Sequence, residues 1–583
     1  MKKKLMLGNE AVARGLYESG CTFVSSYPGT PSTEITEEAA KYPEIYAEWA
    51  PNEKVAVEAA YGAAVYGARS FAAMKHVGLN VAADLVFSAS YAGVNAGFVI
   101  AVADDPGMHS SQNEQDSRHY ARASKIPMLE PSDSQECASF AAAAFEISEQ
   151  FDTPVFLRTS TRVAHSQSFV ECTERREPPL REYIKNPQKY VMAPANARAR
   201  HPIVEARTEK LAAFAGTSGL NTIIPAAPEH AGKIGVVCSG IAYQYAREAL
   251  GDRASYCKLG LVWPLSEKQL REFAASVERV VVIEELDAFL ETELRAMGIA
   301  CTGKELFPRI GEYTPAMIAE KLLGVRPPEA IAAPDVPVRP PVLCPGCPHR
   351  GLFYVLNKMK LTVSGDIGCY TLGSAAPLSA MDSTLDMGAS ISMLHGRNTV
   401  RPDESDRAVA VIGDSTFMHS GVTGLVNAVY NHSASTIIIA DNSITGMTGN
   451  QDNPTTGKTL KGDITSAVNL EALCHAVGVR RVRVCDPYDV EELERILSEE
   501  LAVKEVSVVI ARRPCALLKT VKHGKPYTID ASKCRKCRMC MKIGCPAIRF
   551  DGVASIDPSL CVGCDLCARM CRFGAIEGGA SKC

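Results

Sequence analysis

The sequence predicts a multidomain α/β protein in which doubly wound parallel sheets are followed by a small cysteine-rich α+β domain. The chain has 583 residues, enough for about four domains. Short apolar strands alternate with helices over most of its length, which is typical of parallel βαβ units. Eight of the 21 cysteines fall between Cys534 and Cys571, inside a span of 38 residues. These three observations carry the prediction.

The first predicted block spans residues 1–195 and alternates helices with strands. A helix is expected at Glu10–Gly20, before a strand at Cys21–Tyr27, and the helix expected at Asn52–Ala68 has apolar residues along one stripe. Residues 85–103 carry no charge, but polar side chains interrupt them. We therefore interpret them as a buried helix followed by a strand, and not as a membrane span.

Changes in composition divide the rest of the chain. Residues 196–232 lack clear periodicity and are interpreted as a connector, and six prolines between residues 326 and 341 predict a stiff linker. Strands and helices alternate again on each side of that linker, which predicts two more α/β blocks. The predicted domains are 1–195, the connector at 196–232, 233–325, the linker at 326–341, 342–522 and the cysteine-rich tail at 523–583.

Charge and composition argue against some classes of function. The net charge is −4 and charged residues make up 22% of the chain, which gives no general case for binding nucleic acid or a membrane surface. The apolar run after Met1–Lys4 is too short for a secretory signal, so a cytoplasmic protein is expected. Cytosolic cysteines are kept reduced, and dense cysteine spacing therefore indicates metal binding rather than disulfides.

Two runs of four cysteines, each beginning C-x2-C-x2-C, dominate the tail. This spacing is typical of bacterial ferredoxins, in which three cysteines of each run bind one [4Fe–4S] cluster and the fourth binds the other. Two zinc sites are the alternative, but zinc ribbons space their cysteine pairs more widely. A four-residue gap before Cys545, and Arg572 in place of the usual proline, are departures from the pattern. The expected ligands are Cys534, Cys537, Cys540 and Cys571 for the first cluster, and Cys545, Cys561, Cys564 and Cys567 for the second.

Polar residues follow two consecutive apolar strands of the third block. Gly413-Asp414-Ser415 follows the strand Ala408–Ile412, and Asn442, which follows the strand Thr436–Ala440, comes 28 residues after Asp414. This arrangement resembles the thiamine diphosphate motif, in which strand-end Asp and Asn side chains hold a divalent metal, and hard oxygen ligands suit Mg²⁺. Two ordinary strand-end turns are the alternative. The resemblance implies metal ligation by Asp414, Asn442 and the carbonyl of Ile444, cofactor contacts from Gly413 and Ser415, and a helix starting near Gly421 that directs its N-terminus at phosphate.

A helix in the first block carries a candidate catalytic carboxylate. The segment Asn52–Ala63 resembles the Glu-xx-Ala-xxx-Ala-x-Gly helix of pyrimidine-binding domains, in which a glutamate contacts N1′ of the thiamine aminopyrimidine. We align this glutamate with Glu53, and Glu58 is the second choice. Stabilisation of the first helical turn by an acidic side chain is the alternative role.

Longer motifs extend the likeness over nearly the whole chain. They are Tyr27–Ser32, Lys75–Asn80, Asp104–Arg118 and Cys344–Arg350, together with the ferredoxin-like tail. With these motifs the chain resembles the 2-oxoacid:ferredoxin oxidoreductases, most closely the large alpha subunits of those that act on indolepyruvate. The resemblance implies a pyrimidine-binding domain at 1–195, a transketolase C-terminal-like domain at 233–325 and a diphosphate-binding domain at 342–522.

The same resemblance implies a substrate site. Thr30, in the turn after Tyr27, is expected in the substrate pocket. A basic side chain of the Ser110–Arg118 loop, Arg118 itself, or Arg162 is expected near the 2-oxoacid carboxylate. A rigid turn without contact to substrate is the alternative for Thr30.

Four further cysteines match a third, proximal [4Fe–4S] cluster of related oxidoreductases. Cys344 and Cys347 form a C-x2-C pair, Cys369 follows 22 residues later, and Cys515 comes after a strand near the end of the block. The alternative is a loop that has lost its metal together with two buried cysteines that act as small hydrophobic residues.

Together these features indicate an enzyme. The resemblance implies oxidative decarboxylation of indolepyruvate and related aryl 2-oxoacids with coenzyme A, single-electron transfers through the clusters to ferredoxin, and a smaller beta subunit as partner. A thiamine-dependent decarboxylase without redox function stays open, although the eight tail cysteines argue against it. An electron-transfer scaffold with a degenerate thiamine site also stays open, and Glu53, Asp414 and Asn442 argue against that.

Overall fold

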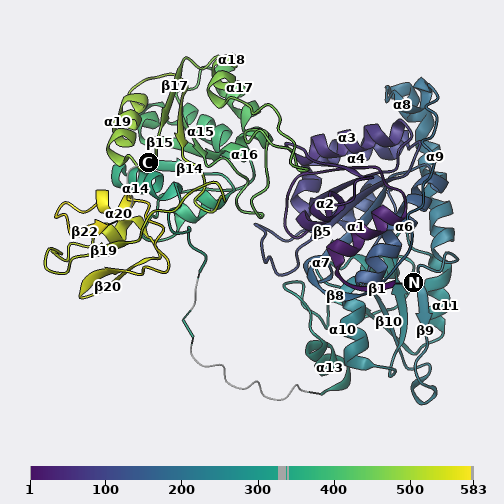
Figure 1. Ribbon diagram of the computed structural model, residues 1–583. Coiled ribbons are helices and arrows are strands. Elements are labelled where there is room, and N and C mark those ends of the chain that lie inside the picture. The colour runs from purple at the N-terminus through teal and green to yellow at the C-terminus, as the bar shows by residue number, and fades with distance from the viewer. Residues whose placement is uncertain (1, 326–335, 338–339, 579–583) are drawn as a thin grey trace. The chain divides into compact units, whose positions relative to one another are not determined.

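The computed structural model describes residues 2–325, 336–337 and 340–578. The chain divides into two compact units, residues 1–334 and 335–583, which are treated one at a time (Figure 1). The predicted proline-rich linker at 326–341 falls almost entirely outside the described residues.

The first unit contains a seven-stranded sheet with the strand order β12-β6-β7-β5-β4-β2-β3. Neighbouring strands are parallel except at one edge, where β12 is antiparallel to β6. Strands β4 and β5 are buried along their whole length, which explains why they are nearly continuous apolar runs. Because the carboxyl ends of parallel strands share one edge, the loops at that edge hold the candidate residues of this unit. The strands are β2 (Phe23–Ser26), β3 (Tyr46–Trp49), β4 (Ser70–Lys75), β5 (Phe98–Asp104), β6 (Met128–Leu129), β7 (Val155–Ser160) and β12 (Leu261–Trp263), and the helices are α1 (Gly8–Glu18), α2 (Thr33–Ala39), α3 (Glu53–Val65), α4 (His76–Ala92), α5 (Arg118–Ser124), α6 (Ser134–Phe151) and α7 (Thr161–His165).

Two smaller sheets complete this unit. One has the order β13-β10-β11-β9, with β9 antiparallel to β11, and the other is the antiparallel pair of β1 and β8. The predicted strand and helix after residue 233 are present as β10 and α10. The elements are β1 (Lys2–Leu7), β8 (Gln167–Cys172), β9 (Thr222–Ile224), β10 (Ile234–Ser239), β11 (Ser255–Leu259), β13 (Arg279–Ile283), α8 (Pro187–Tyr190), α9 (Pro194–Ala215), η1 (Pro228–His230), α10 (Gly240–Leu250), α11 (Glu267–Ala275), α12 (Phe289–Ala296) and α13 (Pro315–Leu323).

The structure differs from the predicted connector at 196–232. Helix α9 occupies most of it and is held to the first sheet's layer by buried Arg207, which donates to the carbonyl oxygens of Ser90 at 2.9 Å and Asp152 at 2.8 Å. The helix contains Pro202 and few buried apolar residues, so its sequence has little helical periodicity. The predicted boundary at residue 233 also does not separate the sheets, because β12 joins the seven-stranded one.

The second unit is built on a parallel five-stranded sheet with the order β14-β15-β16-β18-β17. Val409 and Val411 of β15 face a core that includes α14 and α19, and Ala410 and Ile412 face a second core that includes α15 and α17. Both faces of the sheet are thus covered, as a doubly wound fold requires. The elements are β14 (Thr362–Ser364), β15 (Ala408–Gly413), β16 (Thr436–Asp441), β17 (Arg481–Cys485), β18 (Ser507–Arg512), α14 (His349–Met359), η2 (Cys369–Ser374), α15 (Ala389–Val400), η3 (Pro402–Arg407), α16 (Asp414–Thr416), η4 (Phe417–Gly421), α17 (Val422–Tyr430), α18 (Leu470–Ala476) and α19 (Val490–Leu501).

The cysteine-rich tail forms a small α+β domain in the second unit. Two antiparallel pairs, β19 with β22 and β20 with β21, enclose a core of apolar side chains and cysteines. Tyr488, from the preceding α/β domain, belongs to the same core. The elements are β19 (Tyr527–Ile529), η5 (Met539–Ile543), β20 (Ile548–Asp551), β21 (Val553–Ile556), α20 (Leu566–Arg569) and β22 (Ile576–Gly578).

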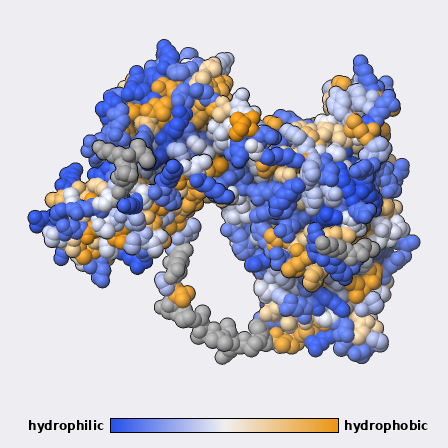
Figure 2. Space-filling model, in the orientation of Figure 1, coloured by the Kyte–Doolittle hydropathy of each residue, from blue (hydrophilic) through white to orange (hydrophobic). Residues whose placement is uncertain are grey.

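In the part of the chain that the structure describes, no helix has the length and apolar character needed to cross a membrane. Hydrophilic residues cover most of the face drawn in Figure 2, with smaller apolar patches between them.

Candidate functional site

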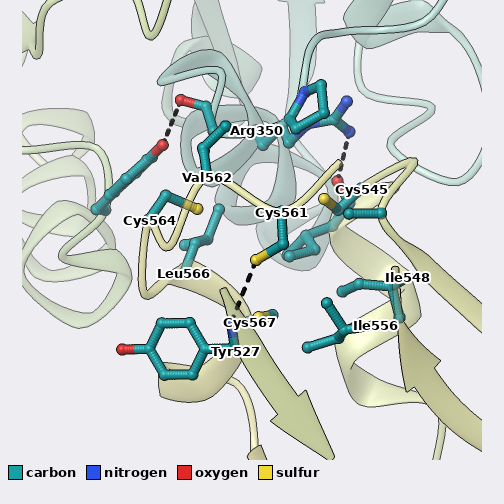
Figure 3. A pocket seen from close by; sticks show the side chains of 15 residues that line it. Arg350, Tyr527, Cys545, Ile548, Ile556, Cys561, Val562, Cys564, Leu566 and Cys567 are labelled. Carbon is teal, nitrogen blue, oxygen red and sulfur yellow. Dashed lines mark hydrogen bonds between the residues drawn. The ribbon is translucent and has the colours of Figure 1, made fainter. Parts of the chain in front are cut away.

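Four cysteine side chains of the tail surround one small pocket. Figure 3 shows their sulfur atoms directed toward the same space. The backbone N–H of Tyr527 donates to Cys561 Sγ at 3.5 Å, and hydrogen bonds of this kind to sulfur tune iron–sulfur clusters. Four thiols around an apolar space fit a [4Fe–4S] cluster. The cysteines are Cys545, Cys561, Cys564 and Cys567.

The other four tail cysteines surround a second pocket. The backbone N–H of Ala575 donates to Cys571 Sγ at 3.4 Å, and backbone hydrogen bonds from Lys536 and Ala554 lower the pKa of the Cys534 thiol. Arg535 and Arg538 line the same pocket. Each pocket thus collects three cysteines of one run and the fourth of the other, the grouping that the spacing predicts. The cysteines are Cys534, Cys537, Cys540 and Cys571.

Cys344, Cys347, Cys369 and Cys515 lie near one another in the second unit. Burial, together with the nearby thiols of Cys515 and Cys344, raises the pKa of Cys369 to about 11. Burial also raises the pKa of Cys347 to about 12. Buried thiols of this kind stay protonated unless a metal binds them, because a thiolate without a cation is costly in an apolar environment. The donor set fits a third cluster.

Arg350 joins the Cys344–Cys347 loop to the residues just before Cys545. Its buried guanidinium donates to the carbonyl oxygens of Cys344 at 3.0 Å, Ile543 at 3.0 Å and Gly544 at 2.5 Å, and also to that of Leu343. Arg350 also lines the tail pocket drawn in Figure 3. The Tyr488 hydroxyl makes a second link by donating to the Gly346 carbonyl at 2.5 Å. These bonds hold two of the cysteine groups side by side. Sequence reasoning gave neither residue a role, although Arg350 ends the Cys344–Arg350 motif.

Three oxygen atoms converge at the carboxyl edge of the five-stranded sheet. Asn442 Oδ1 lies 3.1 Å from Asp414 Oδ1 and 2.7 Å from the carbonyl oxygen of Ile444. Oxygen ligands at about 2.1 Å from an octahedral Mg²⁺ are about 3.0 Å apart, so these separations are close to those of adjacent metal ligands. An amide turned by 180° would donate to both oxygens, whereas a cation held between the three groups would favour the amide oxygen on this side. The predicted ligand set is therefore brought together and fits Mg²⁺.

Asp414 is fully buried at this edge. Its Oδ2 accepts hydrogen bonds from Thr455 Oγ1 at 3.0 Å and Asn453 Nδ2 at 3.3 Å. Burial, followed by repulsion from Asp441, raises the pKa of Asp414 to about 7 in the absence of metal. A divalent cation would offset both effects. Asn453 and Thr455 lie beyond the two motifs, and sequence reasoning missed them.

The helix expected near Gly421 begins earlier. Helical backbone starts at Asp414, directly after β15, and runs through a π-helical segment at Phe417–Gly421 into α17. The wider π turn breaks the usual helical periodicity, which explains the misplaced start. Ser415 and Asp414 therefore lie in the first turn of this helical segment, next to the oxygen ligands.

The carboxyl edge that holds Asp414 and Asn442 adjoins the group of Cys344, Cys347, Cys369 and Cys515 in the fold. The backbone N–H of Cys515 donates to the carbonyl oxygen of Asn442 at 2.9 Å. A Cβ atom added to Gly446 would lie 3.4 Å from Cys369 Sγ and 3.7 Å from Asn442 Nδ2. The proposed metal ligand Asn442 thus lies beside two of the four cysteines.

In the first unit, Glu53 opens helix α3 at the edge of the seven-stranded sheet. Asn52 caps the helix by accepting the Val55 N–H at 2.9 Å, and only 6% of Glu53 is exposed. Gly78 packs so closely that an added Cβ would lie 2.6 Å from Glu53 Oε1. Glu58 is exposed and pairs with Lys54 on the surface. The environment favours Glu53 over Glu58 as the catalytic carboxylate.

Thr30 lies at the same edge, beside a lysine that sequence reasoning left without a role. Ser110 Oγ donates to the Thr30 carbonyl at 3.3 Å, and Lys75 Nζ donates to the Ser110 carbonyl at 2.5 Å. Lys75 ends β4, and only 8% of it is exposed. Its position in the Lys75–Asn80 motif, at a strand end, was the available signal.

Arg118 and Arg162 are not placed as carboxylate ligands for a substrate. Arg118 is 1% exposed and donates to both carboxylate oxygens of Asp116, at 2.8 and 2.5 Å, and to Glu284 at 2.6 Å. Arg162 forms a two-point ion pair with Glu312. Glu284 is 166 residues from Arg118, so the sequence could not reveal this partner. Both arginines form ion pairs within the fold, and a contact of Arg118 with substrate stays a prediction that this pairing does not favour.

Four protein-family descriptions match this chain. Residues 14–230 match "Pyruvate flavodoxin/ferredoxin oxidoreductase, thiamine diP-bdg" and residues 366–511 match "Thiamine pyrophosphate enzyme, C-terminal TPP binding domain". Residues 226–337 match "Indolepyruvate oxidoreductase domain" and residues 554–577 match "4Fe-4S binding domain".

Full-length relatives decide the family. The indolepyruvate oxidoreductase subunit IorA of Archaeoglobus fulgidus is 40% identical over 100% of this chain and 98% of its own length. That of Methanothermobacter marburgensis is 41% identical over 98% of this chain and 97% of its own length. The chain belongs to the IorA family. This family falls within the 2-oxoacid:ferredoxin oxidoreductases, and the chain is accordingly a thiamine diphosphate-dependent oxidoreductase subunit.

More distant likenesses cover part of the IorA-type chain. The 2-oxoglutarate synthase subunit KorA of Methanothermobacter marburgensis is 27% identical over 55% of this chain and 98% of its own length. A structure of 2-oxoglutarate:ferredoxin oxidoreductase from Magnetococcus marinus aligns with a TM-score of 0.47 and 19% identity, over 55% of this chain and 65% of that one.

Proposed function

We propose that the chain catalyses the oxidative decarboxylation of indolepyruvate and related aryl 2-oxoacids with coenzyme A. Each 2-oxoacid anion and CoA thiol would give an aryl-acetyl-CoA, CO2, one proton and two electrons. The electrons would leave singly through [4Fe–4S] clusters to ferredoxin. A smaller beta subunit would complete the enzyme, as the word subunit in the relatives' names suggests.

One observation carries the redox part of this proposal. The oxygen set of Asp414, Asn442 and Ile444 adjoins the cysteine group through the Cys515–Asn442 backbone hydrogen bond. A decarboxylase without redox function has no use for thiols beside its cofactor metal. Here the thiols lie where an electron acceptor would need to be, and Arg350 links them to the tail pocket.

Each residue has a proposed role. Thiamine diphosphate, when bound, supplies the electron sink for decarboxylation. Asp414, Asn442 and the Ile444 carbonyl hold Mg²⁺, with Gly413 and Ser415 against the diphosphate, where the first turn of the helix favours negative charge. Glu53 shares a proton with N1′ of the aminopyrimidine. Thr30 lines the substrate site.

The proposed cluster ligands follow the three cysteine groups. The cluster near the metal edge would be held by Cys344, Cys347, Cys369 and Cys515. The tail would hold one cluster through Cys545, Cys561, Cys564 and Cys567 and another through Cys534, Cys537, Cys540 and Cys571. The block at 233–325 would be the counterpart of the C-terminal domain of transketolases.

An anaerobic assay of the chain with its partner subunit tests the proposal. Indolepyruvate should reduce a viologen dye only when CoA is present, with aryl-acetyl-CoA formed in proportion. Release of the aldehyde without dye reduction would mean a plain decarboxylase. Intact clusters without turnover of any aryl 2-oxoacid would mean an electron-transfer scaffold.

A further inference from the structure

Lys75 is a nearly buried cation at a strand end. Its ammonium group donates to the Ser110 carbonyl at 2.5 Å and lies 3.4 Å from Ser110 Oγ. Among the residues that the structure describes, no ion pair involves Lys75. Buried charged side chains are normally paired, so an unpaired one needs an explanation.

We propose that Lys75 binds the carboxylate of the 2-oxoacid substrate beside Thr30, an inference that rests on the proposed function. The loop after β5 connects the two residues, because Ser110 accepts from Lys75 and donates to the Thr30 carbonyl. Gly29 brings the turn still closer, since a Cβ added there would lie 3.2 Å from Lys75 Cβ. The ammonium therefore lies at the turn that the family resemblance places in the substrate pocket.

Asp105 acts on Lys75 through its charge, but the two form no ion pair among the described residues. Both carboxylate oxygens of Asp105 accept short hydrogen bonds: one from Thr161 Oγ1 at 2.6 Å, and the other from Ser111 Oγ at 2.6 Å and the Ser110 N–H at 2.9 Å. Burial lowers the pKa of Lys75 to about 8, and Asp105 only partly opposes this. An incoming carboxylate would offset the cost of burial and restore a firmly charged ammonium.

The next residue also has an unsatisfied polar atom. His76 Nε2 lies 3.3 Å from Ser111 Oγ, and its buried Nδ1 has no hydrogen-bond partner within the described ranges. Burial, together with Lys75, lowers the pKa of His76 to about 4, so the imidazole is neutral. The start of α4 therefore holds a cation and a neutral polar group, a combination that suits an anionic and polar ligand.

Kinetics of Lys75→Gln and Lys75→Arg in the complete enzyme test the inference. The interaction with the carboxylate is lost once CO2 has left, so Lys75 contributes mainly to ground-state binding. Lys75→Gln should raise KM for the aryl 2-oxoacid about 10- to 100-fold with a smaller change in kcat. Lys75→Arg should recover much of the loss. A KM for Lys75→Gln within twofold of the wild-type value would overturn the inference.

Lys304→Gln is the matched control. Lys304 is also largely buried, its pKa is likewise lowered to about 8 by burial, and its ammonium donates to neutral oxygens of Glu284 and Tyr313. It lies outside the loops around Thr30, so its loss should lower the melting temperature but leave KM unchanged. An equal rise in KM for both variants would mean a structural effect and would overturn the role of Lys75.

Chemical modification separates this inference from the proposed function. In the wild-type enzyme, reductive methylation of Lys75, read by mass spectrometry, should be slowed by phenylpyruvate but not by 2-phenylethanol, which lacks the carboxylate. Protection without any dye reduction would keep Lys75 as a carboxylate site while the proposed function falls. Dye reduction without protection would leave the function standing and overturn Lys75. This arm needs no variant to fold.

Discussion

The edges of the two large parallel sheets hold buried charges of opposite sign. At the edge of the seven-stranded sheet the charge is the ammonium of Lys75, surrounded by hydroxyl and carbonyl groups. At the edge of the five-stranded sheet it is the carboxylate of Asp414, surrounded by an amide, a hydroxyl and a carbonyl. Within the described part of the chain, neither charge has an ion-pair partner.

A third buried charge, that of Arg118, is compensated by acidic side chains of the fold. Arg118 is as deeply buried, but Asp116 and Glu284 neutralise it within the fold. The comparison teaches that burial alone does not mark a functional charge. Buried Arg207 and Arg350 also lack an ion pair within the described residues, but several carbonyl oxygens take up their donors. A buried charge at a strand end with neither kind of compensation is what we interpret as a ligand site, for a divalent cation at Asp414 and for an anionic substrate at Lys75.

The largest expected effect comes from removing the negative charge at the metal edge. Asp414→Asn should abolish retention of Mg²⁺ and thiamine diphosphate and lower activity about 10³-fold or more, because a charged metal ligand is lost. Thiamine content after desalting measures this, with iron content unchanged. Asp441→Asn is the control, since Asp441 already pairs with Arg512 and should cost only stability. Full thiamine content in Asp414→Asn would contradict the metal assignment.

The role of Glu53, at the edge of the seven-stranded sheet, can be tested by a substitution that changes no charge. Gly78→Ala should push the Glu53 carboxylate aside, because the new Cβ would lie 2.6 Å from Glu53 Cγ. We expect kcat to fall by about 10²-fold, as for Glu53→Gln, with thiamine and iron contents retained. Gly62→Ala on α3, the helix that Glu53 opens, should behave like wild type, because an added Cβ there meets nothing within 4 Å. Normal turnover in Gly78→Ala or in Glu53→Gln would remove Glu53 from the mechanism.

A substitution of Cys515 tests cluster binding independently of metal binding at the edge of the five-stranded sheet. Cys515→Ala should lower iron from about twelve to about eight atoms per chain, the difference between three cubanes and two. Magnesium and thiamine should stay, because the bond to Asn442 uses the backbone N–H and not the thiol. Anaerobic iron analysis with thiamine assay decides this. Eight irons already present in the wild type would mean that the cysteine group binds no cluster.

The smallest effect is expected at exposed charges of the tail, which no burial intensifies. Arg535 and Lys536 are exposed at the pocket of the first cysteine run, whereas Arg538 stacks over Phe550 at 4.2 Å and is left unchanged. Reversing the first two to Glu should slow reduction of an acidic ferredoxin several-fold at low salt and leave dye reduction intact. The difference should vanish at high salt. Equal slowing of dye and ferredoxin would mean a damaged cluster.

Patterns local in sequence predicted much of this molecule. The apolar runs of β15 and β16 and the polar residues after them brought Asp414 and Asn442 to one edge, because parallel strands end together. The cysteine spacing grouped the tail pockets for a similar reason, since short loops leave few arrangements. Helix α9 was not predicted, because Pro202 and the small number of apolar residues along one face leave its sequence without a clear helical pattern.

Pairings over long separations could not be predicted. Arg118 carries the same motif whether its partner is a substrate or Glu284, and only the folded chain shows which. Lys75 looks like an ordinary charged residue at the end of a strand. Its proposed role rests on the contact with Ser110, 35 residues away in the sequence. It also rests on Asp105, whose carboxylate accepts hydrogen bonds from Ser110 and Ser111 and forms no ion pair with Lys75 in the described residues.

The position of strand β12 in the sequence affects how the chain folds during its synthesis. This strand is the edge partner of β6, yet about 130 residues separate them, which a ribosome adds in roughly 7 to 26 s at about 5–20 residues per second. Until β12 emerges, β6 presents unpaired backbone N–H and C=O groups, which other chains can bind. A ribosome that stalls before residue 261 therefore leaves a nascent polypeptide in which β6, at the edge of the seven-stranded sheet, is still open to pairing with other chains.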